Sequence, residues 1–418
     1  MKYKAEIFDK LQYLFEETKF NDHQLHCVIK FENKLNDIII ERAMNLLLKA
    51  VPILSCVYKH NNGDSYWETA VNSEFSDLFT IVSNETDFNT FTTSKTNELT
   101  GPQIKACLYS STKDSLSIIM NHMVCDGAGF KQCLYLLSHL YSNLMKDKNF
   151  SPEYILNGDR SIQMITSQIC LTDKISCLLF QNKESNQRKK HMFPMSQDEN
   201  TSPFILTHEI SEARYTLLHD YCKHNNVTIN DIVLAAYYRA LTKIMTVEGK
   251  TLNIPIMIDM RRYLQDKNIN SLTNLSSTVI THIVVNFKET FKETLTKVNE
   301  EMNAFKAKQM GMNGFVKLAL VFKLFSNTLS FSIIKKNLKN PYICMTNIGV
   351  LDYEKLIFKG SPATDAFICG SIKYRPHFQI ALSSFANKIT FSCNLYGSMQ
   401  DRKTIMNFFS LLDKELPQ

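Results

Sequence analysis

A histidine, an aspartate and a glycine lie close together in the stretch NHMVCDG, where they could transfer a proton. His122 is followed by Asp126 and Gly127. A neutral imidazole in a cleft can act as a general base near pH 7. A buried carboxylate beside it needs a cationic partner. The motif therefore indicates either a catalytic site or a simple turn, in which Asp126 caps the next helix and Gly127 permits the bend.

The flanking residues predict a strand, a sharp turn and a helix around this histidine. Apolar residues alternate from Ser115 to His122 and then recur at helical spacing from about Gly129. Successive side chains of a strand point to opposite faces, so His122 is expected to face the interior or a cleft. Three apolar residues would share its face: Leu116, Ile118 and Met120.

Arg261 is the candidate partner for Asp126. It closely follows the apolar run LNIPIMIDM, which is typical of a buried strand and an unusual place for a solvated charge. A pair between these two residues would join the two halves of the chain.

The composition indicates an ordinary globular protein. The chain has 418 residues, of which 44% are hydrophobic and 21% charged, which favours two folded domains over a disordered or fibrous chain. The net charge of +6 is spread over scattered lysines, so we expect no nucleic-acid partner. A mild attraction to an anionic partner remains compatible with this charge.

Cysteine usage and hydropathy indicate a cytoplasmic protein with reduced thiols. The 11 cysteines form no Cys-x-x-Cys pair, the first residues hold no apolar core of signal-peptide length, and no long uncharged apolar run predicts a transmembrane segment. His23 and His26 would lie on opposite faces of a strand, so we expect no metal site.

Helices and strands alternate in both halves of the chain, which predicts an α/β (α+β) class. We expect one lobe over residues 1–155, a polar crossover or linker over 156–203, and a second lobe over 204–418. Thr228 and Asp231 have the spacing of a capping box before an apolar helix, and ALSSFANKITFSCNLY predicts a hairpin. The stretch over 314–334 is apolar nearly all round and predicts a buried core helix; an acyl-tunnel wall and a membrane contact are the alternatives.

These motifs together resemble the acyl-thioester-dependent acyltransferase superfamily. That group includes peptide condensation domains, alcohol acetyltransferases, plant BAHD acyltransferases and chloramphenicol acetyltransferase. NHMVCDG is similar to its His-x-x-x-Asp-Gly signature and IDMRRYL to its Asp-x-Arg segment. The stretches LNDIIIERAMNLLLKAVPILSCVYK, VTINDIVLAAYYRALTKI and ALSSFANKITFSCN are similar to further units in the same order, so the resemblance covers nearly the whole chain.

The resemblance implies a fold and a role for each motif residue. It implies two chloramphenicol-acetyltransferase-like lobes, each a mixed sheet with flanking helices, and a tunnel between them. His122 would be the general base, Asp126 would pair with Arg261 to hold the loop, and Gly127 would let the backbone turn tightly. Oxyanion donors would come from MTNIGVLD, as Thr346 or Asn347.

Departures from the family patterns narrow the branch. Asn121 stands where peptide condensation domains usually carry a second histidine, and the only tryptophan, Trp67, leaves no place for the plant Asp-Phe-Gly-Trp-Gly loop. The resemblance is therefore nearest to microbial alcohol or polyketide-ester acyltransferases and to free-standing condensation-like enzymes.

The activity implied is transfer of an acyl group from a thioester to a hydroxyl or amine. The donor would be acyl-CoA or a phosphopantetheine thioester on an acidic acyl carrier protein, with no permanently bound cofactor, no metal and no covalent acyl-enzyme. Cys125 is a weak alternative nucleophile because it occupies a variable position of the signature. We expect a monomer. The other candidate functions are a non-catalytic module that binds a carrier protein, and a thioester hydrolase.

Overall fold

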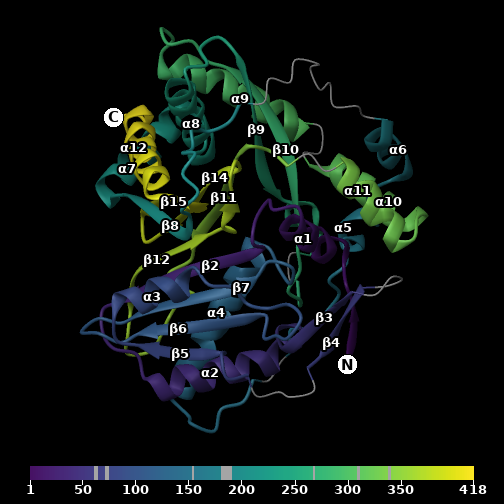
Figure 1. Cartoon of the computed structure of the whole chain (residues 1–418), viewed down its shortest axis with the longest axis vertical. Helices are drawn as coiled ribbons and strands as arrows, with labels where there is room; N and C mark the ends of the chain where they lie inside the picture. The colour runs from purple at the N-terminus through teal and green to yellow at the C-terminus, as the bar shows by residue number, and fades with distance from the viewer. Residues whose placement is uncertain are drawn as a thin grey trace.

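Two mixed sheets with flanking helices form two lobes, which lie one above the other in Figure 1. This computed structural model describes residues 1–60, 65–70, 75–152, 155–179, 191–266, 269–307, 311–337 and 340–418. The predicted fold class is confirmed. The lobe boundaries remain a prediction, and residues 180–190 of the predicted linker lie outside the described ranges.

The first lobe is built on a five-stranded sheet in the order β12-β2-β7-β6-β5. All neighbours are antiparallel except β5 and β6. Apolar residues of α2 and α4 cover one face, and α3 covers the other. The elements are β2 (Gln24–Phe31), β5 (Phe79–Val82), β6 (Ile104–Tyr109), β7 (Ser115–Asn121), β12 (Ala363–Cys369), α2 (Asp37–Ala50), α3 (Glu85–Thr92) and α4 (Gly127–Leu144).

The second lobe is built on a seven-stranded sheet in the order β10-β9-β11-β14-β15-β13, with β8 also paired to β15. Helices α8, α9 and α12 contribute to its core. The elements are β8 (Ser202–Ile210), β9 (Thr251–Asp259), β10 (Ser276–Val284), β11 (Ile343–Leu351), β13 (Lys373–Tyr374), β14 (Phe378–Phe385), β15 (Lys388–Gly397), α7 (Glu212–Asn225), α8 (Ile229–Met245), α9 (Phe291–Ala307) and α12 (Met399–Glu415).

The remaining elements lie around the junction and the edges of the two lobes. Helix α1 (Ile7–Glu17) lies between the lobes in Figure 1, and the small sheet β1-β4-β3 lies near the N-terminus. The other elements are β1 (Lys2–Lys4), β3 (Cys56–His60), β4 (Ser65–Thr69), α5 (Gln163–Thr166), α6 (Leu171–Leu179), α10 (Met312–Leu324), α11 (Asn327–Asn337) and the 3₁₀ turns Pro52–Ser55 and Met260–Tyr263.

Strand β12 connects the lobes in a way that the predicted division does not describe. It follows β11 of the second lobe in the chain, yet it pairs antiparallel with β2 at the edge of the first lobe's sheet. Ile368 lies opposite Cys27, and Phe367 opposite Val28. The first lobe therefore completes its sheet with a strand from the C-terminal part of the chain.

Local sequence explains two of the predicted elements. Thr228 and Asp231 exchange both capping hydrogen bonds at the start of α8, so the predicted capping box is confirmed. The predicted hairpin is β14–β15, whose turn residues Ala386 and Asn387 have φ of 45° and 59°. Two successive positive φ values suit the right-handed twist of the paired strands.

The apolar stretch over 314–334 is not one buried core helix, and that prediction was wrong. The structure has two helices, α10 and α11, with a break between them. Ser326 Oγ accepts from the backbone N–H of Leu329, so a new helix begins there. Leu324 at the break is 62% exposed, whereas Phe315 packs in the core. No helix of the described residues is long and apolar enough to cross a membrane.

Candidate active site

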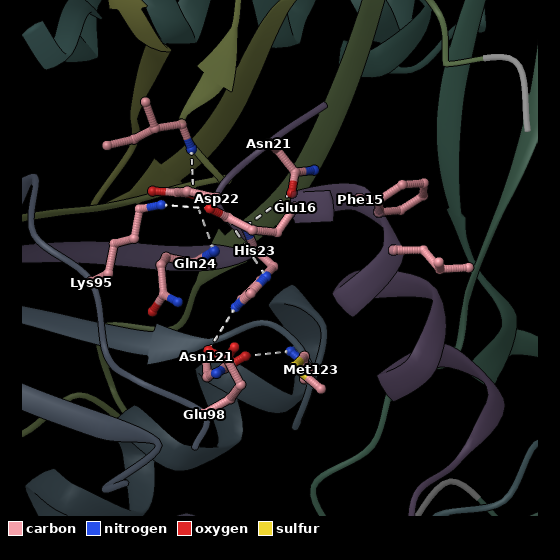
Figure 2. A network of polar contacts seen from close by, with 12 residues as sticks. Phe15, Glu16, Asn21, Asp22, His23, Gln24, Lys95, Glu98, Asn121 and Met123 are labelled. Atoms are coloured by element: carbon pink, nitrogen blue, oxygen red, sulfur yellow. Dashed lines mark hydrogen bonds and ion pairs between the residues drawn. The ribbon is translucent and has the colours of Figure 1, made fainter. Parts of the chain in front are cut away.

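His122 lies in the turn that follows β7, and backbone hydrogen bonds fix that turn. Its N–H donates to the carbonyl oxygen of His23 at 2.8 Å. Asn121 Oδ1 accepts from the N–H of Met123 at 2.9 Å, and its Nδ2 donates to Gln103. Figure 2 shows Asn121, Met123 and His23 around this turn. Asn121 thus holds the turn in shape.

A cavity of about 600 Å³ lies between the lobes, and His122 forms part of its wall. Helix α1 contributes Phe8 and Phe15, and the second lobe contributes residues of β9, β10 and β11. A volume of this size is in the range of small-molecule sites. The structure therefore places the histidine where a bound molecule could reach it.

Burial lowers the pKa of His122 below its usual value of 6.5. Nδ1 is buried without a hydrogen-bond partner of good geometry, although the carbonyl oxygens of His122 and Cys125 and the Asp126 carboxylate lie close enough to raise the pKa in part. The charge of Lys373 lowers it further. The imidazole is therefore neutral at pH 7, the form that accepts a proton.

Asp126 and Arg261 form the ion pair expected between the halves of the chain. Arg261 Nη1 donates to Asp126 Oδ2 at 2.7 Å, and Nη2 donates to the carbonyl oxygen of Thr273 at 2.9 Å. The same Oδ2 accepts from Leu275 N–H and Ser276 Oγ, while Oδ1 accepts from Gly129 N–H at the start of α4. Arg261 and these donors hold the pKa of the buried Asp126 carboxyl below its usual value, against the effect of burial.

The two glycines of the turn differ in the space around them, and neither is needed for a special φ. Neither Gly127 nor Gly129 has a positive φ. A Cβ on Gly127 would lie 3.3 Å from Ile348 Cγ2, across the cavity wall. A Cβ on Gly129 would lie 2.7 Å from Cys125 Cβ, closer than real Cβ atoms approach. Gly127 thus lies in close contact with β11, and the tight-turn role that the resemblance implies for it stays a prediction.

Thr346 and Asn347 lie on β11 and also line the cavity. Asn347 is engaged at both ends, since Nδ2 donates to Asn230 Oδ1 at 3.3 Å and Oδ1 accepts from Gly349 N–H at 2.8 Å. The hydroxyl of Thr346 bonds to no other residue in the described ranges. Thr346 is therefore the better placed of the two to donate to a ligand.

Sequence reasoning missed a second buried ion pair that fastens the same turn. Arg160 forms a bidentate pair with Asp9, at 2.9 and 3.0 Å, and also donates to the carbonyl oxygen of Val124 at 3.0 Å. Asp9 further accepts from Trp67 Nε1 at 2.8 Å. Arg160 lies in the predicted linker, where nothing in the local sequence marks it as buried.

Asn274 is another missed residue. Its Nδ2 donates to the carbonyl oxygens of His122 and Met123, at 3.0 and 3.1 Å. It precedes β10, so the second lobe holds the backbone of the histidine directly. The sequence around it, SLTNLSS, carries no pattern that would predict this contact.

His23 takes part in a polar network and not in a pair with His26. Its ring nitrogens lie 3.8 Å from Glu16 and 3.4 Å from Glu98. Figure 2 shows these three side chains together. His26 Nδ1 instead contacts the carbonyl oxygen of Thr92. No cluster of three or more potential metal ligands is found in the described ranges.

Cys125 has the wrong environment for a nucleophile. It is fully buried, and its Sγ contacts Met120 Sδ. Burial and the nearby Asp126 carboxylate raise the pKa of the thiol well above its usual value. Because the thiolate is the reactive form, Cys125 is disfavoured as the site of an acyl-enzyme.

Solved structures share this fold over nearly the whole chain. The trichothecene 15-O-acetyltransferase of Fusarium sporotrichioides matches with a TM-score of 0.72 and 12% identity, over 100% of this chain and 96% of that one. The first condensation domain of the calcium-dependent antibiotic synthetase has the same TM-score, identity and coverage. Polyketide synthase associated protein 5 of Mycobacterium tuberculosis matches with a TM-score of 0.69 and 12% identity, over 98% and 97% of the two chains.

These comparisons show the fold. No family model matches the sequence, and no curated protein matches it. The predicted resemblance to condensation domains and acetyltransferases is thus confirmed in the architecture of the chain.

Proposed function

We propose that this protein transfers an acyl group from a thioester to a hydroxyl or amine acceptor, with His122 as the general base. The observation that carries the proposal is the position of His122. A neutral imidazole lies in the wall of a cavity between two lobes, and its loop is held by buried contacts from both of them. The fold shared with an acetyltransferase and with condensation domains supports the same chemistry.

The proposed reaction needs one base and one oxyanion donor. His122 removes the proton of the acceptor as its oxygen or nitrogen attacks the thioester carbonyl carbon. The tetrahedral oxyanion then collapses, the carbon–sulfur bond breaks, and the imidazolium returns the proton to the leaving thiolate. Thr346 would donate to the oxyanion from β11. The first turn of α4, whose N-terminal end carries partial positive charge, lies in the same wall at Gly127.

Asp126, Arg261, Arg160 and Asn274 are positioning residues in this proposal. None of them needs to contact the acyl group. Arg261 contacts the Asp126 side chain, Arg160 the carbonyl oxygen of Val124, and Asn274 the carbonyl oxygen of His122. Together they fix the turn over residues 122–126. The donor would be acyl-CoA or a phosphopantetheine thioester on a carrier protein, and the two differ in the group that remains outside the cavity.

The test is thiol release by the purified protein. Short- and medium-chain acyl-CoA thioesters, and the same acyl groups on a phosphopantetheinyl carrier protein, are offered with and without alcohol and amine acceptors. We expect thiol release that depends on the acceptor and falls about 100- to 10,000-fold in His122→Ala. His139→Ala, on the exposed side of α4, is the matched control. Release without an acceptor would indicate a hydrolase, and no release with any donor would contradict catalysis.

A further inference from the structure

Lys373 places a buried positive charge in the same cavity. It lies on β13, is 3% exposed and forms part of the cavity wall. Its Nζ stands 3.7 Å from the centroid of the Phe20 ring. No carboxylate of the described residues lies within 4.0 Å of Nζ, so the ammonium has no ion-pair partner. Burial of an ammonium group without an ion-pair partner is energetically costly, which indicates that the group has a function.

Ser371 brings a second unpartnered donor to the same wall. Its hydroxyl is buried and has no hydrogen-bond partner. Ser371 lies two residues before Lys373, just ahead of β13. Both line the cavity. The cavity wall thus carries an ammonium and a hydroxyl, two positions apart in the chain, that have no acceptor among the described residues.

Asp22 is the carboxyl group whose charge acts on Lys373, but it lies beyond ion-pair distance of the ammonium, and its Oδ2 is buried without a hydrogen-bond partner. Asp22 Oδ1 accepts from the backbone N–H of Ile372 at 2.9 Å and of Gln24 at 3.2 Å. Burial raises the pKa of Asp22 to about 7, so it carries only part of a charge at neutral pH. The other titratable groups that affect Lys373 are His122, which is neutral, and the buried thiol of Cys344. The protein itself thus supplies no full anion for Lys373.

We propose that Lys373 and Ser371 form an anion subsite of this cavity, and that it holds a carboxylate carried by one of the two substrates. The ammonium and the hydroxyl would each donate to the carboxylate oxygens. Phe8, Phe15 and Leu25 make the nearby walls apolar, so the molecule would be an apolar body that ends in an acid. The identity of that molecule as a substrate rests on the proposed acyl transfer; the anion subsite itself does not.

Binding of a simple probe tests the subsite without any turnover. Octanoate and octanamide differ in charge and little in shape, and their affinities are measured by titration calorimetry on the whole protein. We expect the protein to bind octanoate at least about tenfold more tightly, as a charged hydrogen bond predicts. Lys373→Met should bind the two equally, and Ser371→Ala should lose part of the preference.

Lys105→Met is the matched control. Lys105 is half-buried and likewise lies over a phenylalanine ring, Phe91 at 5.1 Å, but it is outside the cavity wall. This variant should keep the full preference for octanoate. Equal binding of acid and amide by the unaltered protein would overturn the subsite, and so would a preference that survives in Lys373→Met. The first comparison needs no variant, so it holds even if a variant fails to fold.

Turnover then separates the source of the carboxylate and tests the two proposals independently. A hydroxy acid is compared with its methyl ester as acceptor, and an acyl-CoA with its ω-carboxyl counterpart as donor. Faster transfer to the free acid places the carboxylate on the acceptor, and faster use of the ω-carboxyl donor places it on the acyl group. Selective octanoate binding without any thiol release would uphold the subsite and contradict the acyl transfer. Transfer without any preference for an acid would contradict the assignment of the carboxylate to a substrate and leave the acyl transfer standing.

Discussion

Asp126 and Arg261 are 135 positions apart in the chain, and their side chains meet at 2.7 Å beneath the turn that carries His122. The Asp126 carboxylate also accepts from both the first turn of α4 and the start of β10. A single buried carboxylate thus joins the helix of one lobe to the sheet of the other. The turn that carries His122 is therefore held by contacts from both lobes.

This pair should show strong coupling in a double-mutant cycle. Asp126→Ala and Arg261→Ala each leave one buried charge without its partner, which typically costs about 3–5 kcal/mol. The double variant should lose less than the two losses added together, because no lone charge remains. Urea unfolding of the four proteins measures the coupling free energy.

The pair between Lys30 and Asp365 is the control for this cycle. It also crosses between distant parts of the chain, at 2.9 Å, but Lys30 is 55% exposed. Exposed pairs contribute only about 0–1 kcal/mol. Strictly additive losses at Asp126 and Arg261 would contradict their energetic coupling, even though the contact is present.

The pH dependence of turnover should report the lowered pKa of His122. The general base must be neutral, so kcat/KM should rise from acid pH with a midpoint below the ordinary imidazole value of about 6.5. Below that value the unfolded chain binds a proton that the folded chain resists, so His122 also makes the fold less stable as pH falls. A profile of kcat/KM against pH measures the first effect. A midpoint above 6.5 would mean that the group that titrates is not this histidine.

Gly129 should tolerate alanine far less well than Gly127. The new Cβ at Gly129 would overlap Cys125 Cβ at 2.7 Å, and relieving this clash must move backbone. We expect a loss of about 1–3 kcal/mol, as for other overpacked sites. The Cβ at Gly127 meets only the γ2-methyl group of the partly buried Ile348, at 3.3 Å, so Gly127→Ala should melt closer to the unaltered protein. Equal melting temperatures for the two variants would show that the turn relaxes freely.

Lys373 should destabilise the folded protein at neutral pH, and this effect should disappear at alkaline pH. Burial lowers its pKa from 10.5 to about 8, so the folded chain gives up this proton more readily than the unfolded chain. The resulting cost, about 3 kcal/mol, is fully present below pH 8 and disappears as pH rises from about 8 to 10.5. Lys373→Met should therefore be the more stable protein at pH 7 and lack this rise. Urea unfolding across that window measures it, and identical pH curves for the two proteins would contradict the burial of the charge.

The parts of the site that lie within one stretch of chain could be predicted from sequence. Alternating residues before His122, a capping aspartate and a helical repeat after it define the strand, turn and helix in the right order. The capping box at Thr228 and the hairpin over β14 and β15 depend equally on neighbours in sequence. Arg261 could be matched to Asp126 because an arginine so close to a buried strand is unusual.

The missed contacts depend on distant parts of the chain. Nothing in ATDAFIC indicates that β12 pairs with β2 and not with its neighbours in sequence. In the sequence, Arg160 looks like an ordinary charged residue of the linker. Only the structure shows that it is buried and paired with Asp9. The partly exposed helices α10 and α11 show the opposite situation. Their residues are apolar enough for a core, but Ser326 breaks the run and leaves Leu324 in solvent.

The borrowed strand β12 has a consequence for how the protein is made. When residues 1–155 have been synthesised, every helix of the first lobe is present in the nascent chain, but the edge of β2 has no partner strand. Its partner, residues 363–369, follows only after most of the second lobe has been synthesised. At about 5–20 residues per second this interval lasts on the order of ten seconds or more. During that time the nascent chain carries an open sheet edge, which is the kind of surface that chaperones and aggregates compete to bind.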